Sequence, residues 1–388
     1  MSVFKFEDIA FNSTEKKKPV DQDKYTYLGL EHLDPDSIYV TRFGAETAPK
    51  GDKLIMKKGD VLFGKRRAYQ KKVAIAPFDG IFSAHGMVLR PKEEVIDKDF
   101  FPMFIKSDYF LDAAIQISVG SLSPTINWRD LKELKFELPS LEEQRKLSEV
   151  LWAIYDMKDK YKKLILATDE LVKSQFIDMF GDPQTNNKGM PVMRINEVVS
   201  LLRNGVTIKQ NKDKEGYPIT RIETISNRTV DRERMGYAGI TDISKYEDYV
   251  LQDGDILMSH INSVKHMGKS AIYEKNIDES IIHGMNLLCL RPKVNIVIPD
   301  FLYSYFQMDF FYEQVLSITK KAVNQASMTI KDLGNLTVIV PDIESQMIYV
   351  DFVRQSNKSK FALQEAIKDL DALSKKIIAE NLIPVGKE

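Results

Sequence analysis

A chain of 388 residues is too long for one small domain, so two or three domains are expected. The apolar fraction of 43% is typical of a globular protein, and no apolar run reaches the roughly 20 residues of a membrane span. The net charge of −1 excludes a surface that is basic throughout, and the single cysteine, Cys289, excludes an internal disulfide and a cysteine-rich zinc module. The first 20 residues contain acids and lack an apolar core, which predicts no signal peptide and a cytoplasmic location.

The stretch GDVLFGKRR, Gly59 to Arg67, has the Gly-x-x-x-x-Gly-Lys spacing of a phosphate-binding loop. Such a loop needs Ser or Thr after its lysine to hold magnesium, and here that residue is Arg66. We therefore interpret Gly59-Asp60 as a tight turn and the alternating apolar residues after it as a strand.

A basic run follows this strand. The eight residues from Lys65 to Lys72 carry five positive charges and no acid. Such a run is either a solvated loop between strands or a surface that binds an anionic partner, and by itself it does not distinguish the two.

Further along, VAIAPFDGIF and GMVLRP have the β-branched and apolar character of buried strands. The segment from Asp99, after its proline, looks helical. Aromatic residues such as Phe100, Phe101, Phe301 and Tyr303 are expected in hydrophobic cores rather than stacked on nucleobases.

After Pro139 the sequence runs to Phe180 without Gly or Pro. Ser140 and Glu143 have the spacing of a capping box, and apolar residues recur close to a heptad seam. These signals predict a long helix that ends at Gly181-Asp182-Pro183.

The chain also repeats itself at an offset of about 200 residues, a pattern that governs the interpretation of the whole fold. Gly59-Asp60-Val61-Leu62 matches Gly254-Asp255-Ile256-Leu257, and SAHGMVLRP matches IIHGMNLLCLRP. The segment ELPSLEEQ matches IVPDIESQ, after which a second long helix is expected to begin at Pro341-Asp342 and to reach about Leu382.

A helix of about 38 residues is about 57 Å long, more than one small domain can cover. Such a helix needs a partner, and the simplest arrangement packs the apolar seams of the two long helices against each other as an antiparallel coiled coil. In the alternative arrangement each long helix packs on its own domain. Two related heads at a fixed separation suit a bipartite linear target. DNA offers one, because its successive major-groove faces lie about 34 Å apart.

At this point the chain resembles the specificity (S) subunit of a type I restriction–modification enzyme. The likeness rests on LPSLEEQRKL and VPDIESQ at the starts of the two long helices, on the junction MFGDPQTNNKG, and on GSLSPTINWRDL. One departure is that the second half reads KKAVNQASMTI where the first has GSLSPTIN.

The resemblance implies a non-catalytic subunit that holds no cofactor and no metal. Its implied partners are double-stranded DNA, two modification subunits that use S-adenosylmethionine to methylate adenine N6, and restriction subunits that supply ATP-driven translocation and cleavage. The expected fold is α+β: two similar α/β target-recognition domains separated by two long antiparallel helices that form a coiled coil, with an internal pseudo-twofold repeat. The expected divisions are target-recognition domain 1 (1–139), long helix 1 (140–180), target-recognition domain 2 (181–341, with a connector at 181–190) and long helix 2 (342–388).

The sequence contains no Asp-Pro-Pro-Tyr or Asn-Pro-Pro-Tyr run that would hold a flipped adenine. His85 and His283 each lie in a His-Gly-Met turn without a second ligand nearby, so we interpret both as structural histidines. We expect no catalytic residue and no metal site.

Readout of base edges requires donors and acceptors on short loops, and Arg, Lys, Asn and Gln are the usual side chains. For the first head the candidate DNA-binding residues are Lys65, Arg66, Arg67, Tyr69, Gln70, Lys71, Lys72, Gly120, Ser121, Ser123, Thr125 and Asn127. For the second head they are Ser259, His260, Asn262, Ser263, Lys265, His266, Lys269, Lys320, Lys321, Asn324 and Gln325, with Arg203, Asn204, Thr207 and Lys209 as a further edge. Some of these side chains would contact phosphates only.

Three alternatives remain open. The chain could be a complete nuclease or methyltransferase, a two-headed scaffold for proteins with no DNA involved, or the specificity chain of another DNA-modification defence system. Assays of cleavage, methyl transfer and DNA binding with the partner present distinguish them.

Overall fold

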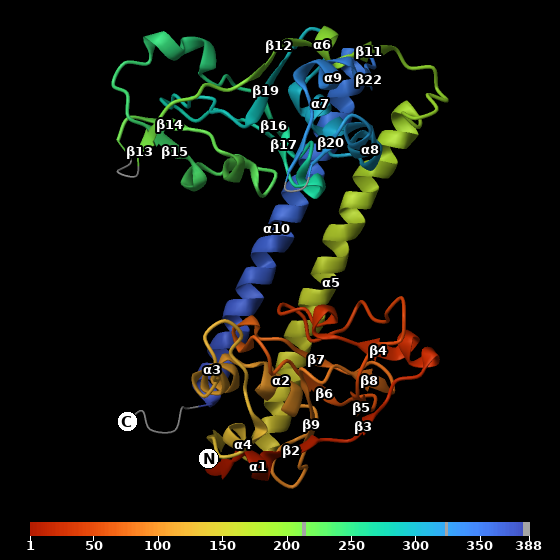
Figure 1. Ribbon diagram of the computed structural model, residues 1–388, viewed down its shortest axis with the longest axis vertical. Coiled ribbons are helices and arrows are strands. Elements are labelled where there is room, and N and C mark those ends of the chain that lie inside the picture. Colours follow the sequence, from red (N-terminus) through yellow and green to blue (C-terminus); the bar gives the residue numbers. More distant parts are fainter. Residues whose placement is uncertain (212–214, 323–324, 383–388) are drawn as a thin grey trace. The chain divides into compact units, whose positions relative to one another are not determined.

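The structure is a computed structural model that describes residues 1–211, 215–322 and 325–382 (Figure 1). The chain divides into two compact units. Unit 1 contains Met1–Lys163 together with Leu363–Glu388, and unit 2 contains Leu164–Ala362. Both units combine strands and helices, which confirms the expected mixed α and β content.

Unit 1 is built on a four-stranded antiparallel sheet of order β2-β9-β6-β7. A second sheet has the order β3-β5-β8-β4, and β1 pairs with β10 at the two ends of the domain sequence. The strands are β1 Ser2–Lys5, β2 Ala10–Ser13, β3 Lys16–Lys17, β4 Tyr27–Leu28, β5 Lys53–Met56, β6 Val61–Phe63, β7 Val73–Ile75, β8 Gly80–Phe82, β9 Met87–Pro91 and β10 Lys135–Leu138. The helices of this part are α1 Phe6–Ile9, α2 Phe101–Lys106, α3 Asp108–Gln116 and α4 Trp128–Leu131.

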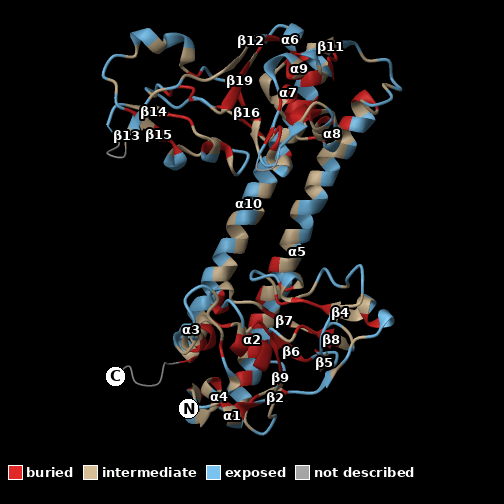
Figure 2. Ribbon diagram, viewed as in Figure 1, coloured by how far each residue is buried: buried red, intermediate tan, exposed pale blue. Residues whose placement is uncertain are grey.

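The core of unit 1 lies between the first sheet and helices α2 and α3, where the rings of Phe6, Phe104, Phe110 and Phe136 pack together in tilted and edge-to-face pairs. The buried residues form the red interior of this unit in Figure 2. The expectation that the aromatics of the 99–117 segment are core residues is therefore confirmed for Phe100 and Phe101, which are fully buried.

Helix α5, Leu141–Phe180, begins in unit 1 as the capping box predicts. The amide of Ser140 donates to Glu143 Oε2 at 2.9 Å, and the amide of Glu143 donates to Ser140 Oγ at 3.4 Å. The last turns of α10, Ile343–Asn381, also belong to unit 1, where Ile377 and Ile378 pack against the core and Leu382, just after the helix, is buried in it. The C-terminal helix thus completes the hydrophobic core that the N-terminal residues begin.

Unit 2 repeats the plan of unit 1. Its antiparallel sheet has the order β12-β19-β16-β18, and β11 pairs with β22 as β1 pairs with β10. The strands are β11 Val192–Arg194, β12 Val199–Asn204, β13 Gln210–Asn211, β14 Tyr217–Ile219, β15 Gly236–Ala238, β16 Ile256–Ser259, β17 Ile261–Asn262, β18 Ser270–Ile272, β19 Leu287–Pro292, β20 Lys320–Lys321, β21 Ala326–Ser327 and β22 Thr337–Ile339. The shorter helices are α6 Ile195–Val198, α7 Pro299–Phe306, α8 Asp309–Ser317 and α9 Ile330–Asn335.

Two pairs of contacts recur in both units. The Gly-Asp turn brings Asp60 against Arg90 in unit 1 and Asp255 against Arg291 in unit 2, each as a two-pronged ion pair. The turn itself is as expected, because Gly59 and Gly254 adopt φ of 92° and 82°, a region that favours glycine.

The second recurrent contact is a buried glutamine at the start of each long helix. Gln144 Nε2 donates to the carbonyl of Pro139 at 2.9 Å, and Gln346 Nε2 donates to that of Pro341 at 2.8 Å. Each glutamine also accepts from a backbone amide in its own unit, so it fastens the helix start to the loop beside it.

Two sequence expectations need correction. The segment after Asp99 is not one helix, because Ser107 ends α2 and caps α3 by accepting from the amide of Phe110 at 3.2 Å. The segment VAIAPFDGIF is not one strand, because β7 and β8 lie in different sheets on either side of a bend. Among the described residues, no helix combines the length and the apolar character that a membrane span requires.

Candidate nucleic-acid interface

The candidate loops of unit 1 leave the same end of its main sheet. Ser13 pairs with Val88, and Phe63 lies opposite both Met87 and Val73. Strands β2 and β6 therefore end, and strands β9 and β7 begin, at the same end of the sheet. The basic run from Lys65 to Lys72 connects β6 to β7 there. The fold therefore holds this run as a short loop on a rigid sheet.

The structure brings the two loops predicted for the first head into direct contact. The amide of Ile126 donates to the carbonyl of Lys65 at 2.9 Å, and the amide of Ala68 donates to that of Pro124 at 3.2 Å. Arg66 Nε donates to Ser123 Oγ at 3.1 Å. Segments that lie nearly 60 residues apart in sequence thus form one surface.

The side chains on this surface differ in their exposure to solvent and in whether they are bonded to other parts of the protein. Arg66, Arg67, Tyr69, Gly120, Ser121 and Asn127 are exposed, and Lys65, Gln70, Ser123 and Thr125 are partly exposed. Lys71 forms ion pairs with Asp108 at 2.8 Å and Asp112 at 2.7 Å, and Lys72 Nζ donates to the carbonyl of Leu30 at 2.6 Å. Lys71 and Lys72 are therefore held by the protein, and they position the loop.

The electrostatics of the loop add a residue that the sequence reasoning missed. Burial lowers the pKa of Lys65, and the charge of Lys16 lowers it further. Lys16 lies on β3 and is exposed, so its charge adds to the positive charge beside the loop. The run Lys16-Lys17-Lys18 was the available signal, although nothing in the sequence places β3 beside the β6–β7 loop.

Unit 2 joins its equivalent loops in a small sheet of order β17-β21-β20. Asn262 lies opposite Ala326, and Lys320 lies opposite Ser327. Ser263, Lys265, Lys320, Lys321 and Gln325 are exposed, and Asn262, His266 and Lys269 are partly exposed. Asn324, also a candidate, lies outside the described residues.

Two candidate residues of unit 2 are buried and therefore not accessible to DNA. Ser259 is 1% exposed and His260 is 6% exposed. Ser259 ends β16 and its backbone bonds to Gly268 and Lys269, while the carbonyl of His260 accepts from the amide of Met328, just after β21. We therefore remove these two residues from the candidate set. Lys269 is tied down like Lys72, since its Nζ donates to the carbonyl of Ser226 at 2.6 Å.

The further edge lies at the same end of the sheet, since Asn204 lies opposite Leu288 and Ser259 lies opposite Leu287. The guanidinium of Arg203 stacks on the ring of Tyr249, 3.8 Å from its centroid. Asn204 Oδ1 accepts from the amide of Gly205 at 3.0 Å, while Thr207 and Lys209 are exposed.

His283 behaves as the sequence analysis expects of a structural residue, whereas the side chain of His85, interpreted in the same way, is exposed. His283 is buried and its Nε2 lies 2.9 Å from the carbonyl oxygen of Leu287. Burial lowers the pKa of His283 to about 4, so the ring is neutral near pH 7. Over the described part of the chain, no three His, Cys, Asp or Glu side chains gather in a way that could hold a metal ion.

Both units share one architecture, and that architecture defines the class of protein. The family model of the type I restriction modification DNA specificity domain matches residues 2–167 and again residues 187–370. The chain belongs to this family, as the sequence resemblance predicts.

Three relatives similar in sequence to this chain are named as specificity subunits of type I restriction enzymes. A protein named as the specificity subunit of the type I restriction enzyme MjaX, from Methanocaldococcus jannaschii, is 47% identical over 159 residues, which are 40% of this chain and 36% of the relative. The EcoKI specificity subunit of Escherichia coli is 23% identical over 72% of this chain and 62% of its own length. The MjaVIII specificity subunit of M. jannaschii is 22% identical over 94% of this chain and 86% of its own length. The chain thus spans less than two thirds of the first two relatives.

Two solved structures share the fold. The S subunit of a type I restriction-modification system from M. genitalium superposes with a TM-score of 0.55 at 13% identity, over 97% of this chain and 94% of that one. A chain from a study of assembly and conformational transition in a type I system superposes with a TM-score of 0.53 at 18% identity, over 98% and 97%.

Proposed function

We propose that the chain reads a bipartite DNA sequence, with one half-site contacted by each unit, as the recognition subunit of a type I restriction–modification complex. The observation that carries the proposal is the meeting of two polar or basic loops at the same end of equivalent sheets. In unit 1 these are the loop after β6 and the Gly120–Asn127 segment, and in unit 2 they are the loop after β16 and the β20–β21 hairpin. Short loops on a rigid sheet can place donors and acceptors against base edges.

The candidate residues, without Ser259 and His260, fall into two groups: exposed side chains, and side chains that are bonded to other parts of the protein. Exposed side chains such as Arg66, Arg67 and Lys320 could reach base edges or phosphates, whereas Lys71 and Lys72 would position the loop. The charge of Lys16 lowers the pKa of Lys65, so an anionic partner beside these two lysines would be favoured. This favours DNA over the alternative of a scaffold that binds proteins only.

We further propose that α5 and α10 form an antiparallel coiled coil that relates the halves by a pseudo-twofold axis. Lys158 pairs with Asp371 in unit 1, and Lys360 pairs with Asp169 at 2.7 Å in unit 2. Asp169 follows Lys158 by 11 residues, and Lys360 precedes Asp371 by 11, as one antiparallel register requires. The divisions 1–139, 140–180, 181–341 and 342–388 then correspond to head, helix, head and helix.

The long helices are also the proposed docking site for two modification subunits, to which restriction subunits would add. Along α5, Val150 and Met157 in unit 1 are 49% and 45% exposed, and Leu164 and Leu171 in unit 2 are 51% and 53% exposed. Apolar side chains that recur every seven residues lie along one face of a helix. A partner helix would bury this stripe, defined as Val150, Met157, Leu164 and Leu171.

In this division of labour the chain itself performs no chemistry and requires no cofactor. The near-zero net charge suits a subunit that shares phosphate contacts with its partners. A specificity chain of another DNA-modification defence system would use the same surfaces with different partners.

Binding of duplex DNA to the chain, alone and with the modification subunits added, tests the proposal. We expect weak binding by the isolated chain and a sharp rise in affinity with the partner, measured by mobility shift. Tight, sequence-selective binding without a partner would contradict the division of labour, and no shift in either sample would contradict DNA recognition.

A further inference from the structure

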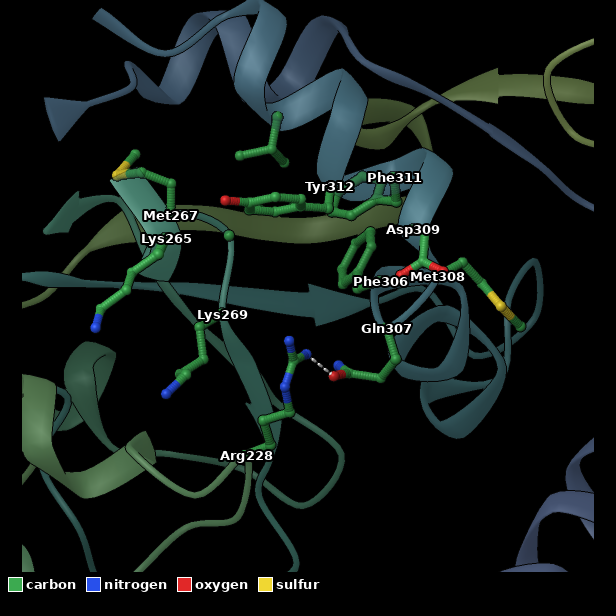
Figure 3. A pocket seen from close by; sticks show the side chains of 12 residues that line it. Arg228, Lys265, Met267, Lys269, Phe306, Gln307, Met308, Asp309, Phe311 and Tyr312 are labelled. Atoms are coloured by element: carbon green, nitrogen blue, oxygen red, sulfur yellow. Dashed lines mark hydrogen bonds between the residues drawn. The ribbon is translucent and has the colours of Figure 1, made fainter. Parts of the chain in front are cut away.

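Unit 2 contains a pocket of about 190 Å³ beside its candidate loops (Figure 3). Its walls come from three places: the loop between β17 and β18, the junction of α7 with α8, and Arg228, which follows the 3-10 turn Ile222–Ile225. Met267, Phe306, Phe311 and Val315 give it an apolar side. The pocket therefore lies between the candidate DNA-binding loop and the helices that support it.

The opposite side of the pocket is cationic. Arg228, Lys265 and Lys269 line it, and in Figure 3 Arg228 points toward Gln307, to whose Oε1 it donates. Gln307 is held in turn, since its Nε2 donates to Ser270 Oγ at 2.9 Å. Among the described residues that line the pocket, Asp309 is the one acid, and it pairs with Lys173 at 2.9 Å.

The three cations are close enough to affect one another. Burial lowers the pKa of Lys269, and the charges of Arg228 and Lys265 lower it further. Burial and the charges of Lys269, Lys265 and Arg228 also lower the pKa of the adjacent His266. An anion in the pocket would offset this repulsion, which makes the site complementary to negative charge.

The matching part of unit 1 is filled by a side chain. The strand pairings of the two units show that Val73 of unit 1 corresponds to Ser270 of unit 2, so Lys71 corresponds to Gly268. Lys71 and Gly268 both have a positive φ, of 48° and 70°. In unit 1 the Lys71 side chain reaches Asp108 and Asp112 at the start of α3. Unit 2 has glycine there, and Val315 of α8 packs close to it, since a Cβ added to Gly268 would lie 3.1 Å from the Val315 side chain. No charged side chain therefore extends from this position toward α8.

We propose that this pocket binds one phosphate group of the DNA backbone through Arg228, Lys265 and Lys269, a subsite that rests on the proposed DNA-reading function and that unit 1 lacks. A phosphate accepts several charge-assisted hydrogen bonds, and Arg with Lys is the usual donor set for it. The contact fixes the register of unit 2 on the duplex and carries no sequence information.

The test uses the full chain with its modification subunits and measures duplex affinity from 50 to 200 mM salt. Gln307→Glu places a negative charge inside the pocket, and Lys265→Ala removes an exposed cation. Each phosphate contact contributes about 0.9 to the slope of log affinity against log salt. We expect either variant to bind more weakly and to lose about 0.9 of that slope.

Matched controls are Gln252→Glu and Lys275→Ala, which make the same charge changes at exposed residues beyond the other end of the sheet. Both should keep the wild-type slope. Wild-type slopes in Gln307→Glu and Lys265→Ala would overturn the pocket assignment alone, whereas a wild-type complex that does not bind duplex would overturn the proposed function.

Free phosphate is the other source of the same chemistry. If 10 mM inorganic phosphate raises the melting temperature of wild type and not of Gln307→Glu, while the two bind duplex alike, then the pocket holds free phosphate and the DNA assignment is overturned. Equal melting temperatures with a reduced DNA slope in the variant support the backbone phosphate.

Discussion

Arg291 holds both carboxylate oxygens of Asp255, with Nε–Oδ1 at 2.7 Å and Nη2–Oδ2 at 2.8 Å. Asp255 is fully buried at the Gly-Asp turn, and Asp60 with Arg90 makes the same pair in unit 1. The pair joins the turn before β16 to the end of β19. It holds the strands from whose opposite ends the candidate loops emerge.

Replacing Asp255 with Asn should therefore destabilise unit 2. The variant leaves Arg291 partly buried without its counter-charge, so we expect a loss of about 3 kcal/mol in the free energy of unfolding. Urea unfolding followed by circular dichroism measures it. Asp351→Asn, at an exposed position on α10, is the control and should stay within about 0.5 kcal/mol of wild type. Equal stability of both variants would contradict a structural role for the pair.

The exposed arginines of the β6–β7 loop are expected to contact DNA. Arg66→Ala with Arg67→Ala should weaken binding to the first half-site and reduce the salt slope by about 1 to 2, because each phosphate contact contributes about 0.9 to that slope. Lys57→Ala with Lys58→Ala removes two exposed charges before β6, at the other end of that strand, and should change neither quantity. Unchanged affinity and slope in the arginine variant would remove this loop from the interface.

The lowered pKa of the buried His283 is expected to make the free energy of unfolding depend on pH. Its pKa is about 4 in the folded chain and about 6.5 when unfolded, so the unfolded state binds more protons between these values. Stability is therefore full above pH 6.5 and falls as the pH drops toward 4, by about 2 kcal/mol between pH 7 and 5.

Urea unfolding at pH 7 and 5 measures this loss. His283→Gln removes the titrating group and should flatten the profile, and the exposed His85→Gln should retain the wild-type profile. Burial also lowers the pKa of His260, which adds a loss of the same sign. An equal loss in wild type and His283→Gln would contradict the assignment.

The heptad stripe on α5 is expected to bind the modification subunits. Met157→Glu or Leu171→Glu puts a charge into that apolar contact and should weaken co-purification of the partner at least about tenfold, since burying an unpaired charge is costly. Leu166 is 65% exposed on the same helix and lies off the stripe, so Leu166→Glu is the control. Loss of the partner in all three variants, or in none, would argue against the stripe as the docking face.

Local signals in the sequence predicted much of this fold. The Ser140–Glu143 spacing marks the start of α5, and the repeated Gly-Asp marks the turn before β6 and β16, because both depend on neighbouring residues. The break at Ser107 was missed because a serine that caps one helix resembles a serine inside a longer one until its hydrogen bond is known.

The candidate site was harder to predict because it depends on contacts between distant segments. Nothing near Lys71 in the sequence indicates that Asp108 and Asp112 neutralise it, and nothing near Ser259 indicates that it is buried. Lys16 likewise acts on the pKa of Lys65 although its strand, β3, pairs in a separate sheet. Composition identified the loops, and tertiary packing decides which of their side chains are free.

We propose that each unit specifies one half of a split DNA sequence for methylation by partner subunits. Mapping N6-methyladenine across the host DNA, with the chain intact, deleted, or carrying Arg66→Ala and Arg67→Ala, reads out this function in the cell. We expect an asymmetric two-part motif that disappears on deletion and whose methylation declines in the double variant. A methylation map that is identical in all three strains would contradict it.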